Sequence, residues 1–81
     1  MNERDYPHIV ELAVPSDGFR SKSDEILAFH REFGVEVRRG RGRNEDGQFY
    51  VRYCFTDPAR ADAFRRRFGG ARLTHPLRVS D

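Results

Sequence analysis

Hydrophobic and polar residues alternate most regularly between Gln48 and Phe55. In an extended chain, successive side chains point to opposite faces. One face then carries Phe49, Val51, Tyr53 and Phe55, and the other carries Gln48, Tyr50, Arg52 and Cys54. An aromatic face opposite a mixed face is typical of a half-buried strand. The pattern therefore predicts a strand in a sheet that is covered on one side.

A helix is predicted directly after this strand. Asp57 can accept hydrogen bonds from the free N–H groups of a first turn, and Pro58 suits the first helical position. Apolar residues then recur at helical spacing, at Ala61, Phe64 and Phe68. Gly69 ends the helix because glycine readily adopts the left-handed conformation that follows helices.

The first half of the chain predicts another strand and another helix. Residues 1–7 are expected to be a frayed lead-in, and residues 8–14 a strand. Val10, Leu12 and Val14 should face the core, while Ile9, Glu11 and Ala13 should face away, since burying the Glu11 charge unpaired would be costly. A helix should run to about Phe33, capped by Ser21 with Asp24 or by Ser23. Its buried stripe is Ile26, Phe29 and Phe33.

The remaining segments complete an alternating order of strands and helices. Residues 35–39 predict a second strand, and the glycine-rich residues 40–47 a hairpin loop. The last strand is either 71–74 or 76–79, because Pro76 interrupts the pattern. This order, βαββαβ, predicts one ferredoxin-like α+β domain over residues 1–81. We expect a four-stranded antiparallel sheet of spatial order 4-1-3-2, with two helices on one face.

Composition narrows the classes of function. The 81 residues carry 15 Lys+Arg against 13 Asp+Glu, a net charge of +2, which is not typical of a strong nucleic-acid binder. One cysteine excludes an internal disulfide, and no apolar run approaches the about 20 residues that span a bilayer. The first residues do not resemble a secretory signal. A cytoplasmic protein fits best.

Catalytic and metal-binding patterns are not evident in the sequence. His8, His30 and His75 lack metal-ligand spacing, and no phosphate-binding loop or nucleophile motif occurs. We therefore expect no enzyme activity, no metal and no cofactor, although ferredoxin-like domains do host enzymes.

Two resemblances bear on function. The layout is similar to an RNA-recognition motif, whose third-strand consensus is matched by Gly47, Val51 and Tyr53, with Tyr50 in place of a stacking phenylalanine. Asp46, Gln48 and Glu11 depart from that family, which leaves one stacking ring. Residues 55–70 also resemble small uncharacterised bacterial proteins, and that resemblance implies no function.

The predicted open face of the sheet is the candidate binding surface. Its candidate residues are Ile9, Glu11, Arg38, Gln48, Tyr50 and Arg52, with Arg39, Arg41 and Arg43 as candidate phosphate contacts. We expect a non-enzymatic interaction module that binds a protein partner or a second copy of itself. Weak single-stranded RNA binding is the alternative. The competing interpretation is a solvated face on which Glu11 and Arg52 pair across adjacent strands.

Overall fold

The computed structural model describes residues 2–75 and 78–79 of the chain. Over these residues the elements are α1 (Asn2–Asp5), β1 (His8–Ala13), α2 (Ser21–Glu32), β2 (Arg43–Glu45), β3 (Gln48–Phe55), α3 (Pro58–Phe68), β4 (Ala71–Thr74) and β5 (Arg78–Val79). The fold is therefore α+β, as the sequence predicts.

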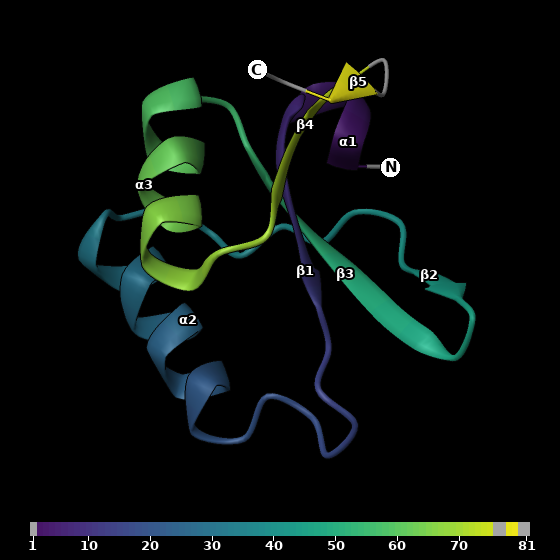
Figure 1. Cartoon of the computed structure of the whole chain (residues 1–81). Helices are drawn as coiled ribbons and strands as arrows, with labels where there is room; N and C mark the ends of the chain where they lie inside the picture. Colours follow the sequence, from purple (N-terminus) through teal and green to yellow (C-terminus); the bar gives the residue numbers. More distant parts are fainter. Residues whose placement is uncertain (1, 76–77, 80–81) are drawn as a thin grey trace.

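The strands form one antiparallel sheet of order β2-β3-β1-β4-β5. The two longest strands, β1 and β3, pair with each other, and Glu11 lies directly opposite Arg52 in their register. Helices α2 and α3 lie together on one side of the strands, whereas α1 lies on the other side (Figure 1). The sheet therefore has a face packed under two helices and an opposite face, which we call the open face.

The core lies between the sheet and the two longer helices. Val10 and Leu12 of β1 pack there with Tyr53 and Phe55 of β3. From the helices come the buried residues Ile26, Phe29, Ala61 and Phe64. The Phe64 ring is central, with ring centroids 5.2 Å from Phe29 and 5.4 Å from Phe55. These are the faces that the period-2 and helical patterns predict.

Two phenylalanines that we expected in the core are exposed. Phe49 is 61% exposed because it lies beside the hairpin turn, beyond the reach of α2 and α3. Phe33 is 39% exposed because α2 ends at Glu32, so the next residue leaves the stripe. Phe68 and Val51 are partly buried against the core.

The start of α2 differs from the predicted capping box. The helix begins at Ser21, and its N-cap is Arg20, which has a φ of 52° and makes no side-chain capping bond. Because Ser21 is itself helical, neither it nor Ser23 is the cap. The start of α3 agrees with the prediction, since the Asp57 side chain accepts a hydrogen bond from the Ala59 N–H at 2.8 Å.

The second strand is displaced from the predicted position. Residues 35–38 are not a strand, and the chain there joins β3 only by an isolated bridge between Arg39 and Tyr53. Strand β2 lies instead inside the predicted loop. Asp46 and Gly47 have φ values of 53° and 83°, and this pair of left-handed residues makes a two-residue hairpin turn. The tight turn brings residues 43–45 directly against β3.

The two ends of the chain also differ from the expectation. Instead of a frayed lead-in, residues 2–5 form helix α1, and Glu3 is buried. The sequence left open whether the last strand was 71–74 or 76–79. The structure has two strands in this region, β4 and β5, which pair with each other. Residues 76 and 77, part of the second alternative, lie outside the described residues.

Candidate functional site

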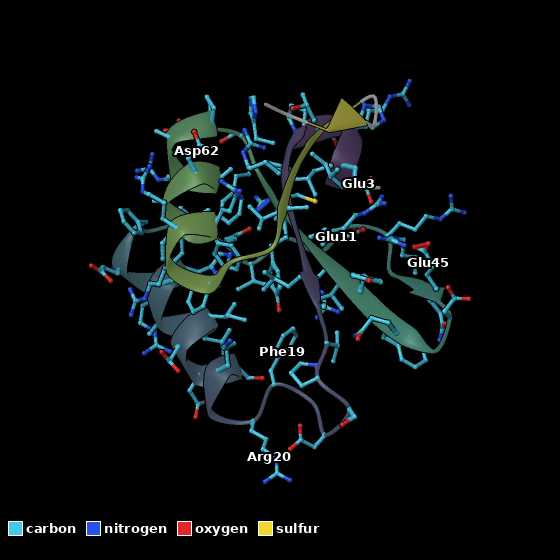
Figure 2. The ribbon with its side chains drawn as sticks, viewed as in Figure 1. Glu3, Glu11, Phe19, Arg20, Glu45 and Asp62 are labelled. Carbon is cyan, nitrogen blue, oxygen red and sulfur yellow. The ribbon has the colours of Figure 1, made fainter. Side chains whose placement is uncertain are left out.

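Five side chains of alternating charge run across the open face. This charged row consists of Glu3, Arg52, Glu11, Arg43 and Glu45. Figure 2 shows the three carboxylates on the side of the sheet away from α2 and α3. The row joins α1, β1, β2 and β3, so it links segments that are far apart in the sequence.

Arg52 holds the middle of the charged row. Its Nε donates to Glu11 Oε2 at 3.0 Å, and its Nη1 donates to Glu3 Oε1 at 3.0 Å. The residue is only 8% exposed. We expected Arg52 to project into solvent, but its guanidinium is held between Glu3 of α1 and Glu11 of β1. The cross-strand pair of Glu11 and Arg52, named as the competing interpretation, is therefore present.

Glu11 accepts hydrogen bonds from both arginines of the row. The Arg43 guanidinium donates to both of its oxygens, through Nε at 3.0 Å and Nη2 at 2.8 Å. This forked contact is the strongest geometry for an arginine and a carboxylate. Hydrogen bonds from Arg43, and then from Arg52, hold the pKa of Glu11 below its ordinary value although burial opposes them. Glu11 is therefore ionised at neutral pH.

Helix α1 closes one end of the open face through Glu3. Its carboxylate accepts hydrogen bonds from the Arg41 backbone N–H and from Arg52. Gly40 passes so close that a Cβ there would lie 2.6 Å from Glu3 Oε2 and 3.0 Å from Cys54 Sγ. Burial raises the pKa of Cys54 to about 11, so its thiol stays protonated and is a poor nucleophile.

The other candidate residues have different surroundings. Ile9 is fully buried under the covered end of the face. Gln48 donates from Nε2 to the Val14 carbonyl at 2.7 Å. Arg38 lies 4.1 Å from the centre of the Tyr6 ring and pairs with Glu36. The structure therefore does not gather the six candidates into one accessible patch.

The accessible part of the candidate binding surface lies at the hairpin of β2 and β3. Tyr50 is half-buried, and the Arg43 guanidinium lies over its ring at 4.0 Å from the centroid. Among the candidate phosphate contacts, Arg43 thus belongs to the charged row, Arg41 is exposed, and Arg39 lies 5.4 Å from the Tyr53 ring centre. Sequence reasoning missed that Arg43, rather than Arg52, accompanies Tyr50. The displaced second strand is the cause.

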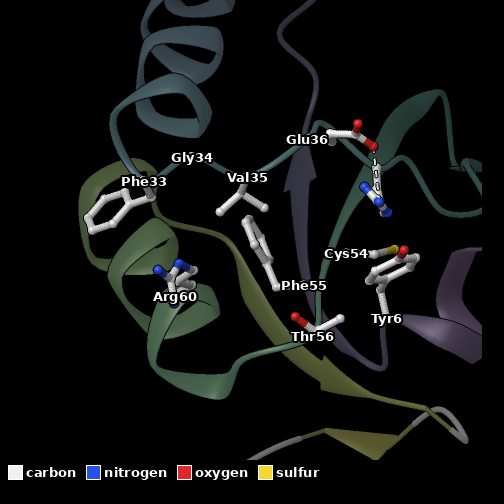
Figure 3. A pocket seen from close by; sticks show the side chains of 10 residues that line it. Tyr6, Phe33, Gly34, Val35, Glu36, Cys54, Phe55, Thr56 and Arg60 are labelled. Carbon is white, nitrogen blue, oxygen red and sulfur yellow. Dashed lines mark ion pairs between the residues drawn. The ribbon is translucent and has the colours of Figure 1, made fainter.

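A pocket of about 300 Å³ is a second feature that the sequence did not reveal. It lies where α2 ends, α3 begins and β3 ends (Figure 3). Its lining residues are Tyr6, Phe33, Gly34, Val35, Glu36, Arg38, Cys54, Phe55, Thr56 and Arg60. We had interpreted residues 35–39 as a strand against β3. Such a strand would have filled this space. The alternation of Val35 and Val37 favoured the strand, so the sequence did not predict a pocket here.

Two further findings concern the described part of the chain. There, no group of three or more histidine, cysteine, aspartate or glutamate side chains is arranged to hold a metal ion. Across the same residues, no helix has the length and apolar character needed to cross a bilayer. Comparisons with protein-family models, with curated proteins and with solved structures found no match for this chain.

Proposed function

We propose that this chain is a small, non-enzymatic interaction module of the ferredoxin-like class, acting through the hairpin end of its open face. The order β2-β3-β1-β4, read from the other edge as 4-1-3-2, supports that class. So do the positions of α2 and α3 on one side of the sheet (Figure 1). Helix α1 and strand β5 are additions to the βαββαβ order.

The Tyr50–Arg43 stack is the observation that carries the proposal. Tyrosine and arginine are the residue types in which binding energy concentrates at interfaces. Here the guanidinium is held in place by Glu11 and Glu45, so little side-chain entropy remains to be lost on binding. Because the Arg43 side chain is 38% exposed as well as bonded, it can contact a partner without leaving the row.

The preferred partner is a second copy of the chain, paired through β2. This edge strand reads Arg43-Asn44-Glu45, and each of its residues is exposed. Two such strands aligned antiparallel about Asn44 would place Arg43 of each copy opposite Glu45 of the other. Opposite charges facing each other across strands stabilise the pair, whereas like charges destabilise it. The edge is therefore complementary to itself, as a two-fold dimer requires.

Sedimentation velocity over a range of concentrations tests this proposal. The parent should show a concentration-dependent rise in mass. Glu45→Arg should reduce the rise, because it opposes arginine to arginine, and Glu25→Arg is the control at an exposed site on α2. Tyr50→Ala should also weaken association more than Phe49→Ala, which alters the neighbouring residue on the opposite face. A parent that stays monomeric at millimolar concentration would contradict self-association, and capture of a different protein would then name the partner.

Weak single-stranded RNA binding is the second candidate. Tyr50 offers one ring, with the exposed Arg41 on the chain leading into β2. A single stacked base contributes about 1–3 kcal/mol, so affinity should be low and should fall steeply with salt. Fluorescence anisotropy with a labelled uridine oligonucleotide measures this. Tight, salt-resistant binding would favour the RNA-recognition resemblance over self-association.

A further inference from the structure

The pocket beside β3 lies on a different surface from the hairpin. Figure 3 shows Phe55 and Val35 between the two walls of the pocket, with Phe33 and Arg60 on one wall and Tyr6, Cys54 and Glu36 on the other. Arg38, which also lines the pocket, contacts Tyr6 and Glu36. Its volume, about 300 Å³, is at the lower end of the range for small-molecule sites. Anything that it binds must therefore be small.

The pocket exists because the chain that follows α2 does not reach the sheet until Arg38. Backbone bonds join this segment to β3 from Arg38 to Gly40, through the Cys54 N–H to the Arg38 carbonyl and the Gly40 N–H to the Arg52 carbonyl. Before Arg38 the segment stands away from the strand. On the other side, the Phe33 ring is fixed by contact with Phe29, at 4.6 Å between centroids. The apolar wall is therefore formed without a ligand.

A guanidinium stands next to that apolar wall. Arg60 lies with its guanidinium carbon 5.9 Å from the Phe33 ring centre, and its Nη1 donates to Asp57 at 2.8 Å. Its Nε is buried and has no hydrogen-bond partner among the described residues. A carboxylate in the pocket cannot reach this enclosed atom. Arg60 nevertheless lines the pocket with a side chain that is 41% exposed, and Asp57 engages only its Nη1.

We propose that this pocket binds a small carboxylic acid with an aromatic ring or a short alkyl chain. The apolar part lies against Phe33, Val35 and Phe55, and the carboxylate accepts from the exposed part of the Arg60 guanidinium. Arginine is suited to this role because its planar fork can bond a second carboxylate while Asp57 keeps Nη1. Arg38 at the far wall is paired with Glu36, so it adds little net charge, and Arg60 supplies the positive charge that favours an acid over a neutral molecule. This site is independent of the proposed self-association.

Benzoate and hexanoate are the probes, followed by amide chemical shifts in ¹H–¹⁵N spectra of the parent protein. Each should produce saturable shifts, with a Kd in the millimolar range or tighter, centred on Gly34, Val35, Phe55, Thr56 and Arg60. Benzyl alcohol, which keeps the ring and lacks the charge, should bind about tenfold more weakly, as expected for the loss of one charge-assisted hydrogen bond.

Three variants separate binding in the pocket from general attraction of anions. Arg60→Gln should weaken benzoate binding about tenfold, and Phe33→Ala should weaken it through the lost ring contact. Both residues are partly exposed, so the fold should survive, as the unperturbed remainder of the spectrum will show. Arg66→Gln, which removes an exposed charge elsewhere on α3, should leave the affinity unchanged. Absence of saturable shifts, shifts centred elsewhere, or equal weakening by Arg60→Gln and Arg66→Gln would overturn the proposal.

Discussion

Replacing Arg52 by methionine tests whether the charged row supports the fold. Methionine keeps an unbranched apolar stem but removes the donors that join Glu3 and Glu11. Glu3 would retain only the Arg41 backbone N–H, while Glu11 would retain the two bonds from Arg43. Because Glu3 and Glu11 are buried, the loss leaves two carboxylates short of partners in a poorly solvated place.

The magnitude follows from the remaining contacts. Removing one partner of a buried ion pair costs about 3–5 kcal/mol, because the other charge is left uncompensated. Glu11 keeps its forked bond to Arg43, so its share of the cost should be small. Glu3 can move into solvent by unwinding the four-residue helix α1, which limits its share. We therefore expect Arg52→Met to lower the free energy of unfolding by about 2–4 kcal/mol.

Urea denaturation followed by circular dichroism measures this loss, with Arg31→Met as the control at an exposed arginine on α2. A double-mutant cycle with Glu3→Gln sharpens the result. If the two residues act through their bond, the combined loss should be clearly smaller than the sum of the two single losses. A loss for Arg52→Met within about 0.5 kcal/mol of the Arg31→Met control would refute the reasoning, since such values are ordinary for surface substitutions.

Three further predictions concern the core, a glycine and the response to acid. Phe64→Ala should cost about 3–5 kcal/mol, because the ring is fully buried, and a thermal midpoint close to the parent's would contradict this. Gly70→Ala should destabilise more than Gly34→Ala in urea titrations, although both glycines have positive φ, because only the Gly70 Cβ would clash with a neighbouring atom, the Glu11 carbonyl oxygen. Burial lowers the pKa of His30 below its ordinary 6.5, so the unfolded chain takes up this proton first, and stability should fall as pH drops below about 6.5. The His30→Phe variant should not show the part of this loss of stability that protonation of His30 causes. Identical pH profiles of the free energy of unfolding for the parent and the variant would contradict this role of His30.

The second half of the chain shows how far local patterns determine the fold. The eight-residue alternation of β3, the Asp57–Pro58 start of α3 and the glycine that follows Phe68 each predict the observed element. These signals depend on neighbouring residues, so they need no knowledge of the rest of the chain. The pairing of β1 with β3 also follows, since these are the most apolar strands and belong in the centre.

The second strand shows where local patterns are insufficient. Residues 35–39 alternate between apolar and polar side chains, as a strand would. The Asp46–Gly47 turn nevertheless pairs residues 43–45 with β3, so hairpin geometry decides which segment becomes the second strand. The same shift places Arg43 beside Glu11 and opens the pocket near Val35. The burial of Arg52 depends on α1, whose Glu3 is 49 residues away in sequence, and no nearby pattern reports so distant a contact.

Disulfide trapping of a cysteine at position 44 tests the proposed dimer most directly. In an antiparallel pair about Asn44, the two copies of this residue would face each other with their Cα atoms about 5.5 Å apart, a separation that a disulfide spans. Cys54 is buried and should not compete. We predict that Asn44→Cys forms a covalent dimer under mild oxidation much faster than Asp17→Cys, placed in an exposed loop far from β2 along the chain. Equal rates of cross-linking for the two variants would contradict pairing through β2.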